Sequence, residues 1–148
     1  MIAVDTNILV YAHRREMAQH QRANRALAEL AEGDELWALP VFVIGEFLRV
    51  VTRPGYFHPP TTRDVAVGTI DSILASPTVR VLHPGRRYWR LLLEALDEGD
   101  AKGNLVLDAE IVAVCREHGV TTVLSEDRDF RRFPSMTLRT LPPGEPAR

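Results

Sequence analysis

The sequence predicts an α/β fold, a three-layer sandwich in which a mainly parallel central sheet lies between layers of helices. Short apolar runs rich in β-branched residues alternate along the chain with longer segments whose apolar residues recur at helical spacing. Such alternation is typical of strand–helix–strand units with parallel strands. With 148 residues, 45% of them hydrophobic and 26% charged, the chain has the size and composition of one globular domain.

The first strand and the first helix meet at an abrupt change from apolar to polar residues. Met1–Val4 is predicted to be a buried strand, and Thr6 and Asn7 are expected to cap the helix that follows. Asp5 therefore stands where a core strand ends and a helix begins, at the edge where open α/β sheets bind ligands. The alternative is that Asp5 only caps the helix.

The next three elements are two helices and the strand between them. Apolar residues at helical spacing predict a helix over 20–32, and a short apolar run predicts a strand over 36–39. Pro40 is expected to open a helix over 40–52, because proline is best tolerated in the first turn. A loop over 53–60 follows, and its aromatic residues either pack on the core or contact a partner.

The middle of the chain is expected to add two helices and one strand. The helices cover 63–75 and 86–98, and the strand covers 79–82. The apolar side of the second of these helices is predicted to consist of Trp89, Leu92, Leu93 and Leu96.

The last part of the chain is expected to hold one long helix, two strands and a short helix. Asn104 is predicted to cap a helix that runs to about His118, with a core stripe of Leu105, Ala109, Val112 and Ala113. A buried strand over 121–124 precedes a short helix that carries Phe130 and Phe133, and the last strand is expected over 137–141.

Composition limits where the protein acts and how it is organised. No apolar run approaches the roughly 20 residues that span a bilayer, and no signal peptide is expected, so we predict a cytoplasmic protein without membrane contact. The lone Cys115 excludes an intramolecular disulfide and is expected in the core. One domain over 1–141 and a flexible, proline-rich tail over 142–148 are predicted.

Two acids from distant parts of the chain are predicted to converge. Asp5 follows the first strand, and Asp127 follows the strand over 121–124. Because parallel strands end at the same edge of a sheet, the two carboxylates are expected to lie close together.

Two helices offer further acids. Glu46 is a charge in an otherwise apolar helix, where an unpaired carboxylate is costly; it either serves the same cleft or forms an exposed pair with Arg49. Asp108 lies at the edge of the core stripe, in the first turns of its helix. It either points into the cleft with Asp5 or only interacts with the helix dipole.

Convergent carboxylates repel one another unless a cation neutralises them. Oxygen ligands without neighbouring Cys or His favour Mg²⁺ or Mn²⁺ over zinc, and such ions support hydrolysis of phosphodiesters. The five histidines have no partners at metal or nucleophile spacing, and the sequence has no glycine-rich phosphate loop.

These residues together resemble the PIN domain, and more narrowly the VapC toxins of type II toxin–antitoxin modules. The likeness rests on four short motifs in order: Asp5-Thr6-Asn7-Ile8-Leu9, Glu46 within a helix, Asn104–Ala109, and Ser125–Phe130. It covers nearly the whole chain, to about Leu141. The resemblance implies a PIN-like fold and a metal-dependent endoribonuclease.

Carried over residue by residue, the resemblance implies an acidic catalytic site of Asp5, Glu46, Asp108 and Asp127. Asp5, Asp108 and Asp127 would bind Mg²⁺ or Mn²⁺, and Glu46 would bind the metal through water or orient the attacking water. Thr6, Asn7 and Ser125 would hold these groups by hydrogen bonds, and Asp129 matches an acid that is less regularly a ligand. Ser125 stands where the family often has threonine.

The resemblance also implies partners. Family members cut structured RNA, often tRNA or rRNA, form homodimers, and are held inactive by a cognate antitoxin whose tail lies over the acidic groove. Phosphate contacts dominate nucleic-acid affinity, so exposed arginines are expected to rim the groove despite the net charge of −2. The leading candidates are Arg14, Arg15, Arg49 and Arg128, and solvated surface positions are the alternative.

Two other functions are alternatives to the nuclease. One is a PIN-like RNA-binding or scaffold module whose acid cluster is inert. The other is phosphoryl chemistry on small molecules, of the receiver or haloacid-hydrolase kind, which also places an Asp after the first strand. The haloacid kind usually has a second Asp where this chain has Asn7, and the receiver kind needs a late lysine, whereas Lys102 is the only lysine.

Overall fold

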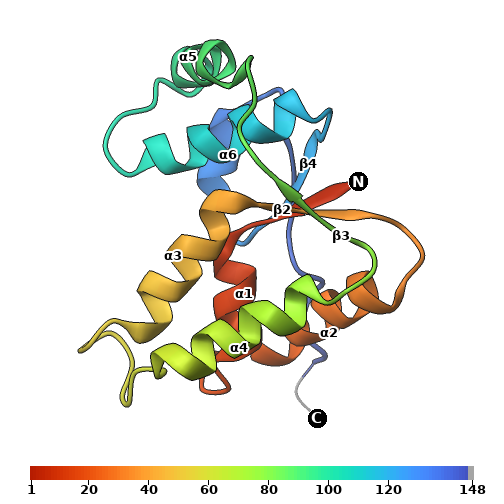
Figure 1. The fold of residues 1–148 in the computed structure, drawn as a ribbon, viewed down its shortest axis with the longest axis vertical. Coiled ribbons are helices and arrows are strands. Elements are labelled where there is room, and N and C mark those ends of the chain that lie inside the picture. Colours follow the sequence, from red (N-terminus) through yellow and green to blue (C-terminus); the bar gives the residue numbers. More distant parts are fainter. Residues whose placement is uncertain (147–148) are drawn as a thin grey trace.

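Five parallel strands form the sheet of the computed structural model, which describes residues 1–146 (Figure 1). The strand order is β3-β2-β1-β4-β5, and all four neighbouring pairs are parallel. The strands are β1 (Ile2–Val4), β2 (Trp37–Pro40), β3 (Val79–Leu82), β4 (Thr122–Leu124) and β5 (Thr137–Arg139). The predicted parallel sheet is confirmed.

Helices cover both faces of this sheet. They are α1 (Thr6–His13), α2 (His20–Glu32), α3 (Val41–Thr52), α4 (Arg63–Leu74), α5 (Tyr88–Gly99), α6 (Leu105–Glu117) and the 3₁₀ helix η1 (Arg128–Arg132). In Figure 1, α1 to α4 lie on one side of the sheet and α5 and α6 on the other, which confirms the three-layer architecture. Among the described residues, no helix is both long and apolar enough to cross a bilayer.

The register of the central strands brings two distant segments level with one another. Val4 pairs with Leu124, and the backbone N–H of Asp5 donates to the carbonyl of Leu124 at 3.0 Å. Strands β1 and β4 therefore end together. The residues that follow them, Asp5 and Ser125, come into contact for that reason.

The core is continuous across the sheet and contains most of the large apolar side chains. Trp37, Phe47, Phe130 and Phe133 are almost completely buried. The predicted stripe on α6 is confirmed, since Leu105, Ala109, Val112 and Ala113 are all buried. Cys115 is a buried core residue, as expected.

The predicted apolar side of α5 is wrong in part. The helix begins at Tyr88, and it buries Leu91, Leu92 and Ala95 rather than a face centred on Trp89. Trp89 is 64% exposed and Leu93 44% exposed. The apolar residues of α5 extend around more than one face, so periodicity alone could not decide which of them meets α6.

Three helix starts differ in detail from the predictions. Asp5, rather than Thr6 or Asn7, is the N-cap of α1, because its own carboxylate accepts from the N–H of Thr6. Pro40 is the last residue of β2, so α3 begins one residue later. Asn104 occupies the N-cap of α6 but makes no side-chain capping hydrogen bond within the described residues.

The predicted tail starts against α2. The carbonyl of Pro142 accepts from Nη1 of Arg22 at 3.1 Å. The flexibility of 142–148 stays a prediction, and residues 147–148 lie outside the described residues.

Candidate active site

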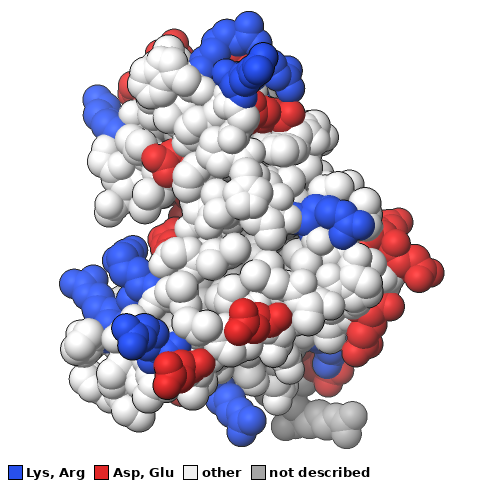
Figure 2. Space-filling model, viewed as in Figure 1, with Lys and Arg blue, Asp and Glu red and all other residues white. Residues whose placement is uncertain are grey.

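A cleft of about 250 Å³ opens at the carboxyl ends of β1 and β4 and contains four acids. Figure 2 shows a hollow with acidic side chains on the left of the molecule, between the part built from α5 and α6 and the part built from α3 and α4. The acids that line the cleft are Asp5, Glu46, Asp108 and Asp127. The predicted convergence of these side chains is confirmed; their catalytic and metal-binding roles stay predictions.

Asp5 is the most firmly held of the four. Its Oδ1 accepts from the N–H of Thr6 at 2.7 Å, and its Oδ2 accepts from Oγ of Ser125 at 2.7 Å. The residue is only 6% exposed. Asp5 does cap α1, as the alternative interpretation held, and the same carboxylate also lines the cleft.

Ser125 is the centre of a small buried network. Its hydroxyl donates to Asp5 and accepts from the backbone N–H of Asp127 at 2.9 Å and from Nδ2 of Asn7 at 3.0 Å. Asn7 in turn accepts from the backbone N–H of Glu126 at 3.3 Å through its Oδ1. The network fixes the start of α1 to the segment after β4, so Asp5 and Asp127 hold a defined separation.

Glu46 belongs to the cleft and to a surface pair at the same time. Its Oε2 accepts from Oγ1 of Thr6 at 3.0 Å, whereas its Oε1 lies 3.8 Å from Nη2 of Arg49. The predicted Glu46–Arg49 pair is present, but Arg49 is 59% exposed, so water weakens the interaction. Both interpretations of Glu46 therefore describe part of its surroundings.

Three aspartates lie close enough to share one ion. Asp108, Asp127 and Asp129 each offer a carboxylate oxygen, and these oxygens lie within 4.8 Å of one another. Oδ1 of Asp127 accepts from the N–H of Asp129 at 2.9 Å and so caps η1. The chain reversal at this cap brings Asp129 back beside Asp108.

The four acids and Asp129 repel one another. Burial, followed by the negative charges of Asp5, Asp127, Asp129 and Glu46, raises the pKa of Asp108 to about 8. Burial also raises the pKa of Asp5 to about 6, although the hydrogen bonds from Ser125 and Thr6 oppose this effect. A cation in the cleft would stabilise the charged forms of both Asp5 and Asp108.

Comparison with known proteins agrees with this geometry. The sequence profile of the PIN domain matches residues 2–135. Ribonuclease VapC43 of Mycobacterium tuberculosis is 39% identical over 139 residues, which are 94% of this chain and 94% of that protein. The chain belongs to the VapC family of PIN-domain ribonuclease toxins.

Solved structures share the fold of this VapC-family chain. VapBC2 from Rickettsia felis, bound to a promoter DNA fragment, aligns with a TM-score of 0.67 and 20% identity over 96% of this chain and 100% of that one. A toxin–antitoxin complex from Klebsiella pneumoniae aligns with a TM-score of 0.60 and 17% identity over 93% of this chain and 96% of that one. At these identities the likeness establishes the fold alone.

The donor set of the VapC-family chain suits a hard divalent cation. The close group consists of carboxylates only, and burial and mutual repulsion make their shared negative charge costly without a counter-charge. Hard oxygen donors select Mg²⁺ or Mn²⁺ rather than zinc. The residues present therefore fit a metal site, and the identity of the ion stays a prediction.

The four arginines predicted to contact RNA are placed very differently. Arg14 is engaged within the VapC-family chain: it pairs with Glu16 and donates to Thr61 and to the carbonyl of Pro59. Arg15 lines a separate groove formed by α1, α2 and α4. Arg49 and Arg128 are exposed next to cleft acids. Arg14 therefore keeps the fewest free donors for a phosphate.

Sequence reasoning did not place any aromatic residue in the cleft, and for the loop over 53–60 it left open whether the aromatic residues pack on the core or contact a partner. Tyr11, Tyr56 and Phe57 all line it. Of the two aromatic residues in the loop over 53–60, Phe57 packs at 7% exposure and Tyr56 is 62% exposed. The available signal was two adjacent aromatic residues directly after a Pro-Gly turn, since such turns present the next side chains in a fixed direction.

Proposed function

We propose that this chain is an endoribonuclease that hydrolyses RNA phosphodiesters with Mg²⁺ or Mn²⁺ and acts as the toxin of a toxin–antitoxin pair. The observation that carries the proposal is the cleft in which Asp5, Glu46, Asp108 and Asp127 meet, with Asp5 fixed by Ser125. Membership of the VapC ribonuclease family supports it independently.

The carboxylates would hold the ion at one end of the cleft. Asp5, Asp108 and Asp127 are the ligands that the resemblance implies, and the short separations among Asp108, Asp127 and Asp129 add Asp129 to this set. When bound, such an ion neutralises the carboxylates, polarises a phosphoryl oxygen and lowers the pKa of water.

The remaining groups of the cleft would position the reactants. Glu46 is oriented by Thr6 and still has lone pairs free, so it can accept a proton or a hydrogen bond from water that attacks the phosphate. Ser125 and Thr6 keep the two oxygens of Asp5 in place, so the side chain need not reorganise when substrate binds. The exposed guanidinium of Arg49 can contact a neighbouring phosphate.

The partners proposed are structured RNA, a cognate antitoxin and a second copy of the chain. Within RNA, we propose tRNA or rRNA as the substrate, in the cytoplasm. The toxin–antitoxin complex from Klebsiella pneumoniae with the same fold supports an antitoxin partner. An antitoxin segment that carries a positive charge would complement the acid cluster, which makes the cleft the proposed site of inhibition.

The decisive experiment is incubation of the antitoxin-free protein with total cellular RNA in Mg²⁺, in Mn²⁺ and in a chelator. We expect discrete fragments that need metal and are absent with Asp5→Ala or Asp108→Ala. Asp71→Ala is the matched control, because Asp71 is an exposed helix aspartate that does not line the cleft. Cleavage by Asp5→Ala at the wild-type rate would refute the proposal, and a folded protein that neither cuts RNA nor binds metal would be the inert module instead.

A further inference from the structure

One large aromatic side chain stands exposed at the acidic cleft. Tyr56 lines the cleft together with Asp5, Asp108 and Asp127, yet 62% of the residue is exposed to solvent. Its neighbour Phe57 is 7% exposed and lies at the base of the same loop. An exposed aromatic ring beside a polar site is suited to bind a planar group, because stacking removes apolar ring surface from water.

The loop that carries Tyr56 is a preformed turn. The carbonyl of Arg53 accepts from the N–H of Tyr56 at 3.4 Å, with Pro54 and Gly55 between them. Gly55 has φ +83°, which a side chain would make strained, and proline followed by such a glycine is typical of a type II turn. The backbone of Tyr56 is therefore set before any ligand binds.

Phe57 and Arg14 support the ring of Tyr56 from within the chain. The rings of Tyr56 and Phe57 meet edge to face, with centroids 5.0 Å apart and planes at 84°. The guanidinium of Arg14 lies 4.4 Å from the centroid of Phe57, and it also donates to Thr61 and to the carbonyl of Pro59. Arg14 thus ties the second half of the loop to the end of α1.

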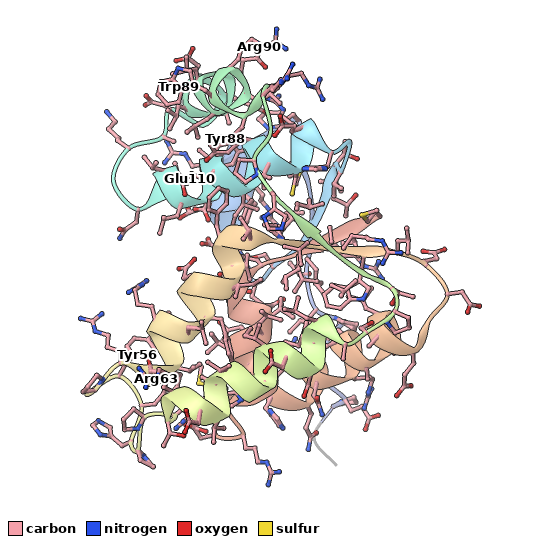
Figure 3. All side chains as sticks on the ribbon, in the orientation of Figure 1. Tyr56, Arg63, Tyr88, Trp89, Arg90 and Glu110 are labelled. Atoms are coloured by element: carbon pink, nitrogen blue, oxygen red, sulfur yellow. The ribbon has the colours of Figure 1, made fainter. Side chains whose placement is uncertain are left out.

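Three exposed arginines lie at the helix ends that flank the loop of this aromatic residue. Arg49 and Arg53 end α3, Arg63 begins α4, and all three are exposed. Figure 2 shows one group of basic side chains at the lower left and another at the top, and Figure 3 shows Tyr56 and Arg63 together at the lower left. We call these three arginines the basic rim; Arg49 connects it to the cleft through its ion pair with Glu46.

We propose that Tyr56 stacks on an unpaired base of the RNA next to the phosphate in the acidic cleft, while Arg49, Arg53 and Arg63 hold the flanking phosphates. The inference rests on the proposed ribonuclease activity and adds the recognition of a single-stranded nucleotide. Stacking on aromatic side chains is the general way in which proteins bind splayed bases, and it tolerates any base.

The test uses binding without cleavage, in Mg²⁺, on protein that carries Asp5→Asn. The probes are a short single-stranded oligoadenylate and an abasic strand of equal length, which has the phosphates but no bases. Tyr56→Leu removes the aromatic ring at similar volume, and Tyr56→Phe retains it. We expect Tyr56→Leu to weaken binding of the oligoadenylate about 5- to 150-fold and to leave binding of the abasic strand unchanged. Tyr56→Phe is expected to bind both probes like the parent protein.

A second pair of variants tests the rim. Arg53→Gln is expected to weaken the binding of both probes equally and to reduce the salt dependence of binding, because a contact to phosphate does not depend on the base. Arg86→Gln, an exposed arginine just before α5 that does not line the cleft, is the matched control and should bind like the parent.

The outcomes separate this inference from the proposed function. A wild-type chain that cuts no RNA refutes the ribonuclease, whereas a wild-type chain that cuts RNA beside a Tyr56→Leu variant with unchanged binding overturns only the stacking role. If Tyr56→Leu weakened the binding of both probes equally, the stacking role of Tyr56 would also be overturned. A shift in oligomeric state caused by Tyr56→Leu, with RNA binding intact, would show that the ring contacts a second protein chain instead.

Discussion

The hydroxyl of Ser125 donates a 2.7 Å hydrogen bond to Oδ2 of Asp5 across 120 positions of sequence. Ser125 is fully buried, and the same oxygen accepts from Asp127 N–H and from Asn7. The position of Asp5 in the cleft therefore depends on one oxygen atom that also accepts hydrogen bonds from two other groups.

We expect Ser125→Ala to lower both stability and RNA cleavage. It leaves the N–H of Asp127 and the carboxylate of Asp5 without their partner, and an unsatisfied buried polar group costs about 1–3 kcal/mol. Thermal unfolding and RNA cleavage measure the two effects. Ser125→Thr, which keeps the hydroxyl, is the control and should retain most activity; an Ala variant as active as the Thr variant would contradict this role for the hydroxyl.

Asp129 is expected to contribute to metal affinity. Its carboxylate lies with those of Asp108 and Asp127 inside 4.8 Å, so Asp129→Asn removes one negative charge from the group without a large change in shape. We expect weaker Mn²⁺ binding by calorimetry, on the order of 10-fold or more. Asp97→Asn, an exposed aspartate on α5, is the control; equal affinities in the two variants would exclude Asp129 as a ligand.

Adjacent arginines should differ sharply in their effect on stability. Arg14 covers Phe57 and donates to Thr61 and Pro59, whereas Arg15 is exposed. We expect Arg14→Ala to lower the free energy of unfolding by about 1–3 kcal/mol and to expose the loop over 53–60 to proteases, because it removes hydrogen bonds to a charged group. Arg15→Ala should change it by less than about 0.5 kcal/mol. Similar unfolding curves for the two variants would rule out this anchoring role.

His13 is expected to make the fold sensitive to mild acid. Its Nε2 lies 2.9 Å from Oγ1 of Thr61 and its Nδ1 3.4 Å from Oγ1 of Thr69, and burial, followed by the charge of Arg14, lowers its pKa. Because the folded-state pKa lies below that of the unfolded chain, the stabilisation is complete above about pH 6.5 and is lost as the pH falls through the folded-state pKa.

The measurement is the difference in unfolding free energy between wild type and His13→Gln from pH 7 to pH 5. The raised pKa values of Asp5 and Asp108 act in the opposite direction, because protonation relieves those groups, but they do so in both proteins. We expect the advantage of wild type to shrink as the pH falls. A difference that stays constant over this range would show that His13 does not titrate as proposed.

The sequence allowed the sheet edge and its acids to be predicted because both follow from simple rules. Apolar runs that alternate with helices require parallel strands, and parallel strands end together, so Asp5 and Asp127 had to approach one another. Glu46 and Asp108 were found because a charge in or beside an apolar helical stripe is unusual.

What the sequence could not supply depends on how individual side chains rotate and pack. The position of Asp129 near Asp108 depends on the cap at Asp127, where one side-chain oxygen accepts from the backbone N–H of Asp129. Arg14 and Arg15 are identical in type and adjacent. Only the path of the loop over 53–60 determines which of the two side chains forms contacts within the chain. The exposed side of α5 was mispredicted for a similar reason, since the choice depends on how α5 crosses α6.

The pairing of the start of α1 with the segment after β4 also bears on the synthesis of a toxin. Residues 5–7 are translated well before residues 125–129, which complete the acid cluster. A nascent chain therefore carries Asp5 without Ser125 or Asp127, and its cutting site does not yet exist. The acid cluster is therefore complete only once the last part of the chain has been made, so a chain truncated before residue 125 lacks it.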